Sequence, residues 1–226
     1  MSKLIWDNIG ERIYETGVQN GVFYPRDNDG NYPKGVVWNG LTTVTESPSG
    51  AEANPIYADN IKYLNLMSAE EFGATIEAIT FPEEFALCDG SAELGKGVYI
   101  GQQTRKSFGF VYKTIVGDDV LGNELGYKLH IVYNATASPS DKAYATINES
   151  PDAVAFSWEI TTIPIPIPGH KPSATVIIDS TKTEPAKLKE IEDILFGADA
   201  GPGGTPAAKV ARLPLPVEIA AIFAQG

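Results

Sequence analysis

The sequence predicts a mainly β protein whose strands run antiparallel. Several segments alternate large apolar and polar side chains with a period of two, clusters of Asn, Asp and Gly separate them, and helical spacing is rare. The 226 residues are 43 % hydrophobic and 20 % charged, as is ordinary for a globular protein. This length allows one large domain or two small ones, and we expect a single domain over residues 1–226.

The first strands are predicted close to the N-terminus. Ile13–Val18 and Val22–Tyr24 flank the tripeptide Gln19-Asn20-Gly21. Asn and Gly supply the positive φ that a tight turn requires, so we expect these two segments to form a β-hairpin. Phe72–Phe81 also alternates and is predicted to be a strand.

Four further strands are predicted in the second half of the chain. They are Ser107–Val116, Tyr127–Tyr133, Ala153–Thr161 and Ala174–Asp179. Asp118, Asp119, Asn123 and Gly126 lie between the first two, which indicates a turn or a flexible tip there.

The alternation within these strands predicts which side chains share a face. In the first strand they are Phe108, Phe110 and Tyr112, opposite Val111 and Lys113; in the second, Leu129, Ile131 and Tyr133, opposite Lys128 and His130; in the third, Val154, Phe156, Trp158 and Ile160. One large apolar face on each strand predicts a clear core side.

Helical segments are predicted late in the chain. Pro185 suits a first helical turn, apolar residues then recur at helical spacing up to Leu195, and Gly197 ends the segment. A second, short helix is predicted at Glu83–Leu87. The apolar segment Val217–Phe223 either packs on its own domain or contacts a neighbour.

Two segments fit neither a regular strand nor disorder. Thr45–Tyr57 is rich in small residues and proline, and loops of this length inside a domain are usually functional or interfacial. Ile163–Pro168 alternates Ile with Pro, so it is expected at a sheet edge or as an arm that crosses onto something else. Ala198–Ala208, rich in Gly, Ala and Pro, is predicted to be a flexible connector.

The charge balance excludes some classes of partner. The 17 basic and 29 acidic side chains give a formal charge of −12, which disfavours binding to nucleic acid or to an anionic membrane. The acidity serves solubility, or it forms a surface that tolerates nucleic acid nearby without binding it. We expect no secretory signal at the start and no membrane helix, because apolar runs fall short of the roughly 18 residues required. A single cysteine, Cys88, fits a reducing compartment.

The sequence predicts no catalytic, cofactor-binding or metal site. His130 and His170 lie in different segments without a second ligand at metal spacing, and Cys88 follows apolar residues, as a buried inert thiol does. Asp27–Asn31 resembles the start of a calcium loop, but its glycine comes too early and Trp38 stands at the closing position, so it is interpreted as a hairpin tip. Carboxylates adjacent in sequence need not converge as an acid/base pair; these are Glu70, Glu71, Glu83 and Glu84.

An ordered set of motifs resembles the major tail proteins of siphophages, the long-tailed, non-contractile bacteriophages. The central block consists of Asp59–Leu66, Ala69–Ala78 and Pro82–Phe85; the flanking matches are Trp38–Leu41, Glu46–Glu52, Lys128–Tyr133, Phe156–Glu159 and Arg212–Pro216. The resemblance covers nearly the whole chain, and its specificity lies in the order of the motifs. Gly201–Ala208 is longer than the family pattern suggests, which leaves the path of the C-terminal segment open.

This resemblance implies a β-sandwich or partial barrel with a flanking helix. It also implies homohexameric rings that stack into a hollow tube around a tape measure protein, bounded by tail-tip (initiator) and tail terminator proteins. The subunit would assemble in the host cytoplasm and reside in the long, flexible tail of the virion, with double-stranded DNA passing through the lumen without specific binding during genome ejection. The loop at 45–57, the Ile–Pro segment and a C-terminal arm at 198–226 are expected to make the contacts between subunits.

Other classes fit parts of the same pattern. Another virion structural protein, such as a tail terminator, a capsid decoration protein or the tube of a contractile tail, would share the acidic β-rich character. A β-sandwich carbohydrate-binding module would be a monomer with clustered exposed aromatics. An enzyme is disfavoured, because the sequence shows no catalytic constellation.

Overall fold

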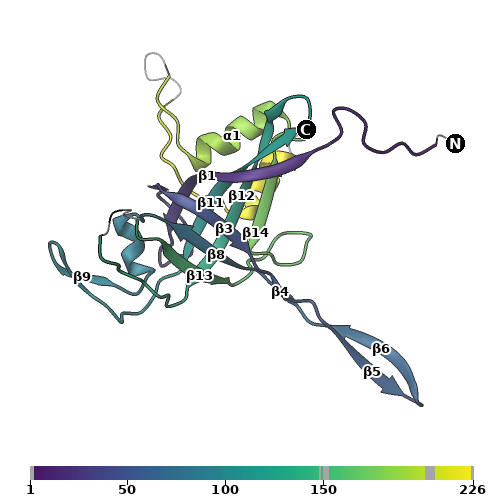
Figure 1. Ribbon diagram of the computed structural model, residues 1–226, viewed down its shortest axis with the longest axis horizontal. Coiled ribbons are helices and arrows are strands. Elements are labelled where there is room, and N and C mark those ends of the chain that lie inside the picture. Colours follow the sequence, from purple (N-terminus) through teal and green to yellow (C-terminus); the bar gives the residue numbers. More distant parts are fainter. Residues whose placement is uncertain (1–2, 148, 150–152, 202–206, 225–226) are drawn as a thin grey trace.

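The protein is built on one curled antiparallel sheet of eight strands (Figure 1). The computed structural model describes residues 3–147, 149, 153–201 and 207–224. The strands of this sheet are β1 (Tyr14–Pro25), β2 (Val36–Trp38), β3 (Leu41–Glu46), β8 (Gly73–Ala78), β11 (Phe108–Asp118), β12 (Gly122–Ala137), β13 (Phe156–Thr162) and β14 (Thr175–Asp179). Their order is β2-β1-β11-β12-β13-β8-β3, and β14 also pairs with β12.

Smaller elements extend this sheet or cover it. They are the strands β4 (Ser49–Gly50), β5 (Ala53–Ala58), β6 (Ile61–Met67), β7 (Glu70–Glu71), β9 (Ala92–Gly95) and β10 (Val98–Ile100), the 3-10 helix η1 (Glu83–Leu87), and the α-helices α1 (Pro185–Leu195) and α2 (Pro216–Ala224). Among the described residues, no helix combines the length and apolar character needed to cross a membrane.

The β11–β12 hairpin forms the centre of the sheet and is buried on both faces over much of its length. The predicted alternation of β11 is confirmed: Phe108, Phe110 and Tyr112 point into one core, and Val111 points into the other. At the end of β11, Asp118 accepts hydrogen bonds from the backbone N–H groups of Val120 and Leu121, which shapes the predicted turn.

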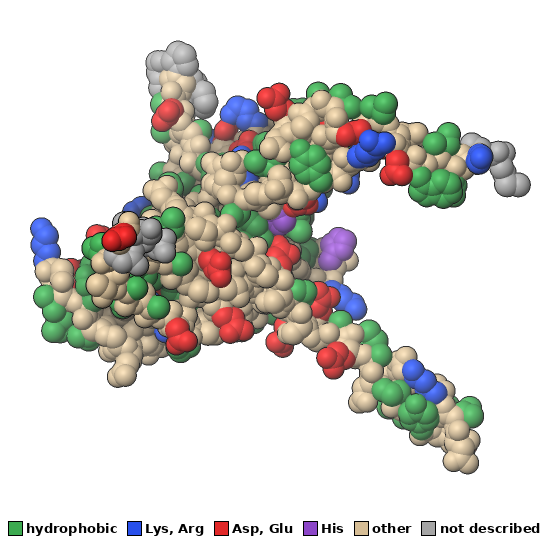
Figure 2. All heavy atoms as spheres, viewed as in Figure 1, with side chains coloured by type: hydrophobic (Ala, Val, Ile, Leu, Met, Phe, Trp, Pro, Cys, Tyr) green, Lys and Arg blue, Asp and Glu red, His purple; other side chains and the backbone are tan. Residues whose placement is uncertain are grey.

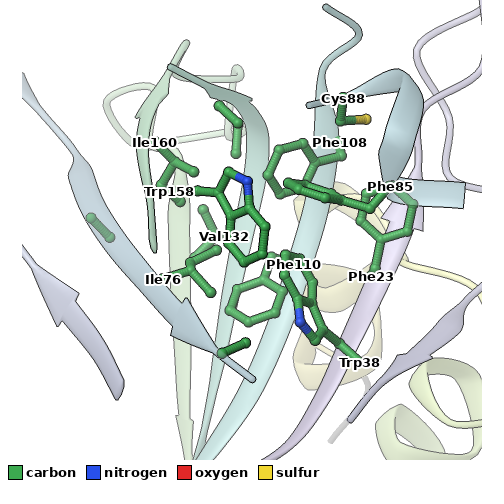
Figure 3. Close-up of a cluster of buried hydrophobic side chains, with 14 of the residues drawn as sticks. Phe23, Trp38, Ile76, Phe85, Cys88, Phe108, Phe110, Val132, Trp158 and Ile160 are labelled. Carbon is green, nitrogen blue, oxygen red and sulfur yellow. The ribbon is translucent and has the colours of Figure 1, made fainter. Parts of the chain in front are cut away.

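The first core fills the concave side of the curled sheet (Figure 3). It is aromatic: the rings of Trp38 and Phe85 lie 4.6 Å apart, and Trp158 and Phe85 lie 5.2 Å apart at a steep angle. Buried indole N–H groups need acceptors. Trp38 donates to the carbonyl of Thr80 at 2.9 Å, and Trp158 donates to the Asp89 carboxylate at 3.0 Å.

Close approach of β1 and β3 curls the sheet toward closure. The absence of a side chain at Gly21 leaves room for Leu41, because an added Cβ would collide with the end of the Leu41 side chain and lie 3.0 Å from the carbonyl oxygen of Trp38. The result is a partial barrel with an interior packed by side chains.

The second core lies on the convex face, beneath the two helices. Ile191 and Leu195 of α1 and Ile219 of α2 pack with Leu129 and Ile131 of β12. This arrangement confirms the predicted fold class, a mainly β partial barrel with a flanking helix. The helix begins at Pro185 as predicted, and Gly197 follows its end with φ +81°, which favours glycine. The short helix predicted at Glu83–Leu87 is also confirmed.

One local prediction was wrong in conformation, and one strand begins later than predicted. Gln19-Asn20-Gly21 makes no hairpin, because β1 continues through it alongside β11, from Tyr14 opposite Gly117 to Pro25 opposite Phe108. The positive φ of Asn20 (54°) is used for an irregularity in the pairing instead of a chain reversal. In the third predicted strand, regular pairing begins at Phe156, later than expected.

Thr45–Tyr57 is also more regular than predicted. It contains the end of β3, the short strand β4 and most of β5, and it forms one side of a long hairpin that leaves the body (Figure 1). The partner strands β6 and β7 satisfy its backbone, which explains how so long a segment stays ordered outside the sheet.

Candidate functional site

A two-stranded projection, here called the hairpin arm (residues 49–71), is the most prominent feature outside the body (Figure 1). Strands β5 and β6 pair from Ala53 opposite Met67 to Ala58 opposite Ile61. The turn residues Asp59 and Asn60 have φ of 50° and 62°, the positive pair that the tightest hairpin turns need.

The arm exposes large apolar side chains on both of its faces. No residue of β5 or β6 is buried. Ile56 and Leu64 lie opposite each other on one face, and Tyr63 and Met67 occupy the other. Tyr63 is 68 % exposed and Met67 62 %. An isolated two-stranded hairpin is at best marginally stable in water, and contiguous exposed apolar surface marks an interaction site.

The N-terminal segment is a second projection, here called the N-terminal extension (residues 3–13). It leaves the body on the same side as the arm, and hydrophobic side chains follow both projections (Figure 2). Trp6 is 74 % exposed and Ile9 82 %. The extension is attached near the β11–β12 turn, where the Gly10 N–H donates to Asp119 at 2.9 Å and Arg12 lies 3.7 Å from the same carboxylate.

A third, smaller projection is the β9–β10 hairpin. It carries exposed Leu94 (73 %), Val98 and Tyr99, and it lies at the opposite end of the molecule from the hairpin arm (Figure 1). The protein therefore presents exposed apolar side chains at two opposite ends.

The outward face of β3, β8 and β13 has a different character. Its side chains are small or acidic, and none of the three strands contains Lys or Arg. Glu77 lies opposite Thr43 and Ser157, and Glu159 lies opposite Thr75. These side chains are exposed or half-buried, in contrast to the convex surface that α1 and α2 cover. The face is polar, negatively charged and open to solvent.

The Ile–Pro segment lies against its own domain. Ile165 exchanges two backbone hydrogen bonds with Ser173, at 3.0 and 3.1 Å, and packs against the second core, whereas Ile163 is 66 % exposed. The extended conformation expected from alternating prolines is thus observed, with one isoleucine left at the surface.

The C-terminal segment also packs on its own domain. Ile219 of α2 is buried, the carbonyl of Pro214 accepts a hydrogen bond from Tyr133 at 2.8 Å, and Arg212 pairs with Glu218 at 2.7 Å. Ala198 and Lys209 exchange backbone hydrogen bonds. Residues 202–206 of the predicted connector lie outside the described residues.

A polar cluster lies between the roots of the two large projections. His130 of β12 is 8 % exposed and stacks on Tyr112, with ring centroids 4.6 Å apart. Its two nitrogens face Glu15 and Glu46, each at 3.3 Å. Glu15 follows the N-terminal extension and Glu46 precedes the hairpin arm. The alternation correctly placed His130 opposite Leu129 and Ile131 but could not show that this face is buried.

The other residues considered for chemistry remain separate. His170 is exposed in a loop, and Cys88 is buried, where burial raises the pKa of its thiol to about 12 and keeps it protonated. Asp27 accepts hydrogen bonds from the backbone N–H groups of Asp29 and Asn31, as in a tight turn. Within the described part of the chain, no three His, Cys, Asp or Glu side chains form a group that could hold a metal ion.

The exposed apolar surface of the distal half of the hairpin arm was not predicted. The signal was present: Asp59-Asn60 separates two segments rich in apolar residues. The sequence also could not identify the acidic open face, because Glu77 and Glu159 become neighbours only through the pairing of β8 with β13.

No family model matches the chain, and no curated protein sequence matches it. A chain of the anti-feeding prophage baseplate, solved by cryo-EM with six-fold symmetry, is similar with a TM-score of 0.36 and 9 % identity, over 81 % of this chain and 100 % of that one. A chain of the sheath–tube complex of an extracellular contractile injection system (PVC) in its extended state gives 0.33 and 13 %, over 71 % and 88 %. TM-scores of this size assign no function to the protein.

Proposed function

We propose that this protein is the structural subunit of a non-contractile phage tail tube, forming homohexameric rings that stack around a tape measure protein. The proposal combines the resemblance of the sequence motifs to siphophage major tail proteins with the surface of the folded chain. Tail-tip and terminator proteins would bound the tube, and the subunit would act without catalysis.

The hairpin arm carries this proposal. It holds exposed Tyr57, Tyr63, Leu66 and Met67 well away from the body, where no part of the described chain covers them. Burying such side chains gains roughly 25 cal/mol per Å² of apolar surface, so contact with a second copy would stabilise both the arm and the assembly. Apolar elements at two ends suit repeated, head-to-tail contacts that build a polymer.

The open acidic face is suited to line the lumen of a tube through which DNA passes. With β3, β8 and β13 toward the lumen, Glu77 and Glu159 would repeat around each ring, and α1 and α2 would lie toward the outside. Duplex DNA carries one negative charge per ~1.7 Å of its axis, so an acidic wall without Lys or Arg repels it and keeps it from binding. This placement makes the net charge of −12 part of the function.

The proposal is tested by negative-stain electron microscopy and light scattering of the purified chain, alone and with tape measure and tail-tip proteins. Hollow tubes with a regular axial repeat, or six-fold rings, are expected. Persistent monomer in the presence of both partner proteins would contradict the proposal. A single ring that never stacks would indicate a terminator, and a flat lattice would indicate a capsid decoration protein.

A further inference from the structure

The cluster around His130 brings together side chains from three strands, β1, β3 and β12. Glu15 lies at the start of β1, directly after the N-terminal extension, and Glu46 is the last residue of β3 before the hairpin arm. His130 lies between them on the central strand β12. The cluster borders a cavity of about 160 Å³ that Glu46, Glu70 and His130 help to line.

The hydrogen bonds determine which nitrogen of a neutral His130 carries the proton. The Thr114 hydroxyl donates its single hydrogen to Glu15 at 2.5 Å. Thr114 Oγ1 lies 2.9 Å from Nε2 of His130, and toward the ring this oxygen can only accept. Nε2 is therefore the protonated nitrogen; it donates to Thr114 and lies 3.3 Å from Oε1 of Glu15.

The other ring nitrogen, Nδ1, therefore carries no proton in the neutral ring. It is buried and makes no hydrogen bond to the described residues, yet it lies 3.3 Å from Oε1 of Glu46. That oxygen already accepts a hydrogen bond from the Tyr112 hydroxyl at 2.6 Å. In the neutral ring Nδ1 is therefore a buried polar atom without a hydrogen bond to the described residues. A proton on Nδ1 would turn the same contact into an ion pair between the ring and the Glu46 carboxylate.

The surrounding charges are mostly negative. Partial burial acts to raise the pKa of Glu15, but hydrogen bonds from Lys128 and Thr114 lower it overall, so this carboxylate is ionised. Burial, followed by the hydrogen bond to Glu46, raises the pKa of Tyr112, so its hydroxyl remains a donor. The charged and titratable groups facing His130 or its partners from each packed element are Glu15 (β1), Glu46 (β3), Glu70 (β7), Tyr112 (β11), Lys128 (β12) and Asp179 (β14).

We propose that His130 is a proton-dependent clasp: its doubly protonated ring binds Glu15 and Glu46 together and fixes the hairpin arm to the sheet. Histidine changes charge within the range of about pH 5 to 8. Without the second proton on the ring the attraction to Glu46 is lost, and the root of the arm is held by backbone pairing and the Tyr112 hydroxyl alone. Lower pH would therefore narrow the range of arm orientations.

Pulsed electron–electron resonance distances between the arm and the body test this clasp. Spin labels are placed through Lys62→Cys on β6 and Glu190→Cys on α1, both exposed, while the buried Cys88 stays unlabelled. Labelled chains are diluted into unlabelled full-length protein, so that only the distance within one chain is measured. The two pH values are compared on the monomeric fraction, because a neighbouring subunit in an assembly would hold the arm by itself.

The expected result is a distance distribution that narrows when the pH is lowered from about 8 to about 5.5. His170→Gln, which removes an exposed histidine, should narrow in the same way. His130→Gln should keep one width at both pH values, and Glu46→Gln should do so as a second test if the first variant folds poorly. An unchanged width in the wild type, or equal narrowing in both His130→Gln and Glu46→Gln, would overturn the proposal.

Discussion

The curled sheet and the hairpin arm use the same residue types in opposite ways. In the sheet, Trp158 and Phe110 are fully buried among other aromatic side chains. In the arm, Tyr57 and Tyr63 are about two-thirds exposed. Both regions satisfy their backbones by antiparallel pairing, so the difference lies in what their side chains contact. The sheet buries its large side chains within one chain, whereas no described part of the chain covers the apolar side chains of the arm.

The stability of the single chain and its assembly should therefore depend on different regions of the molecule. Substitutions in the core should destabilise the single chain, because packing there is dense and cavities are costly. Substitutions in the arm should leave the single chain nearly unchanged and alter only its association.

The largest effect on the single chain is expected from Trp158→Ala. It empties the centre of the aromatic core and removes the hydrogen bond to Asp89, so the free energy of unfolding should fall by about 3–5 kcal/mol. Urea denaturation followed by tryptophan fluorescence and circular dichroism would measure it. Trp158→Phe, which keeps an aromatic ring, should cost clearly less; equal losses for both variants would contradict the packing account.

The arm is tested by the double variant Tyr63→Asp with Leu66→Asp. It places charge on both faces of β6, so tube or ring formation should be lost, while the unfolding free energy changes by less than ~0.5 kcal/mol. Light scattering and electron microscopy report the assembly. Tyr144→Asp is a matched control, since Tyr144 is 76 % exposed and lies outside the arm. If the arm variant formed normal tubes, the arm would not be part of the interface between subunits.

A smaller, purely electrostatic effect is expected on the open sheet face. In Glu77→Lys with Glu159→Lys, tubes should still assemble, but genome passage should slow because Lys attracts the DNA backbone. Ejection from particles carrying such tubes would be followed by release of dye-accessible DNA. Glu124→Lys with Glu190→Lys changes the net charge equally at exposed positions away from that face. Equal slowing in both variants would mean that the position of the charge is irrelevant.

The smallest effect is expected where a partly exposed ion pair attaches α2. Partial burial acts to raise the pKa of Glu218, but hydrogen bonds from Arg212 and Leu215 lower it overall, below the ordinary value of 4.5. The pair therefore stabilises the fold above that value and loses its contribution as the pH falls through the lowered pKa. Because both side chains are 41 % exposed, Glu218→Gln should cost at most about 0.5 kcal/mol at neutral pH. Thermal unfolding over a pH series that starts at 7 and continues well below 4.5 should show a difference between the variants that shrinks as the pH falls; a constant difference would contradict the ionic cause.

The fold was predictable from the sequence where alternation reflects a local property of the chain. The faces of β11, β12 and β13 and the limits of α1 follow from side-chain spacing, proline and glycine. Gln19-Asn20-Gly21 shows the limit of such signals. The same positive φ serves a hairpin or an irregular strand, and only the presence of β11 alongside decides between them.

The candidate interface was less accessible to prediction than the fold. Proline and small residues in Thr45–Tyr57 resemble a loop, and a strand whose side chains are all exposed lacks the polar–apolar alternation that a half-buried strand shows. The pairing of Glu77 with Ser157, and the meeting of Glu15 with His130, depend on contacts distant in sequence. The composition predicts a negatively charged protein, but only the order of the strands in the sheet shows which acidic side chains lie near one another.

A cryo-EM reconstruction of tubes assembled from the full-length protein tests the central claim most directly. The expected map shows six subunits in each ring, with β3, β8 and β13 facing the lumen, α1 on the outside, and β5 and β6 of each hairpin arm covered by a neighbouring subunit. A tube whose lumen is lined by α1, or whose hairpin arms remain free in solvent, would contradict this account.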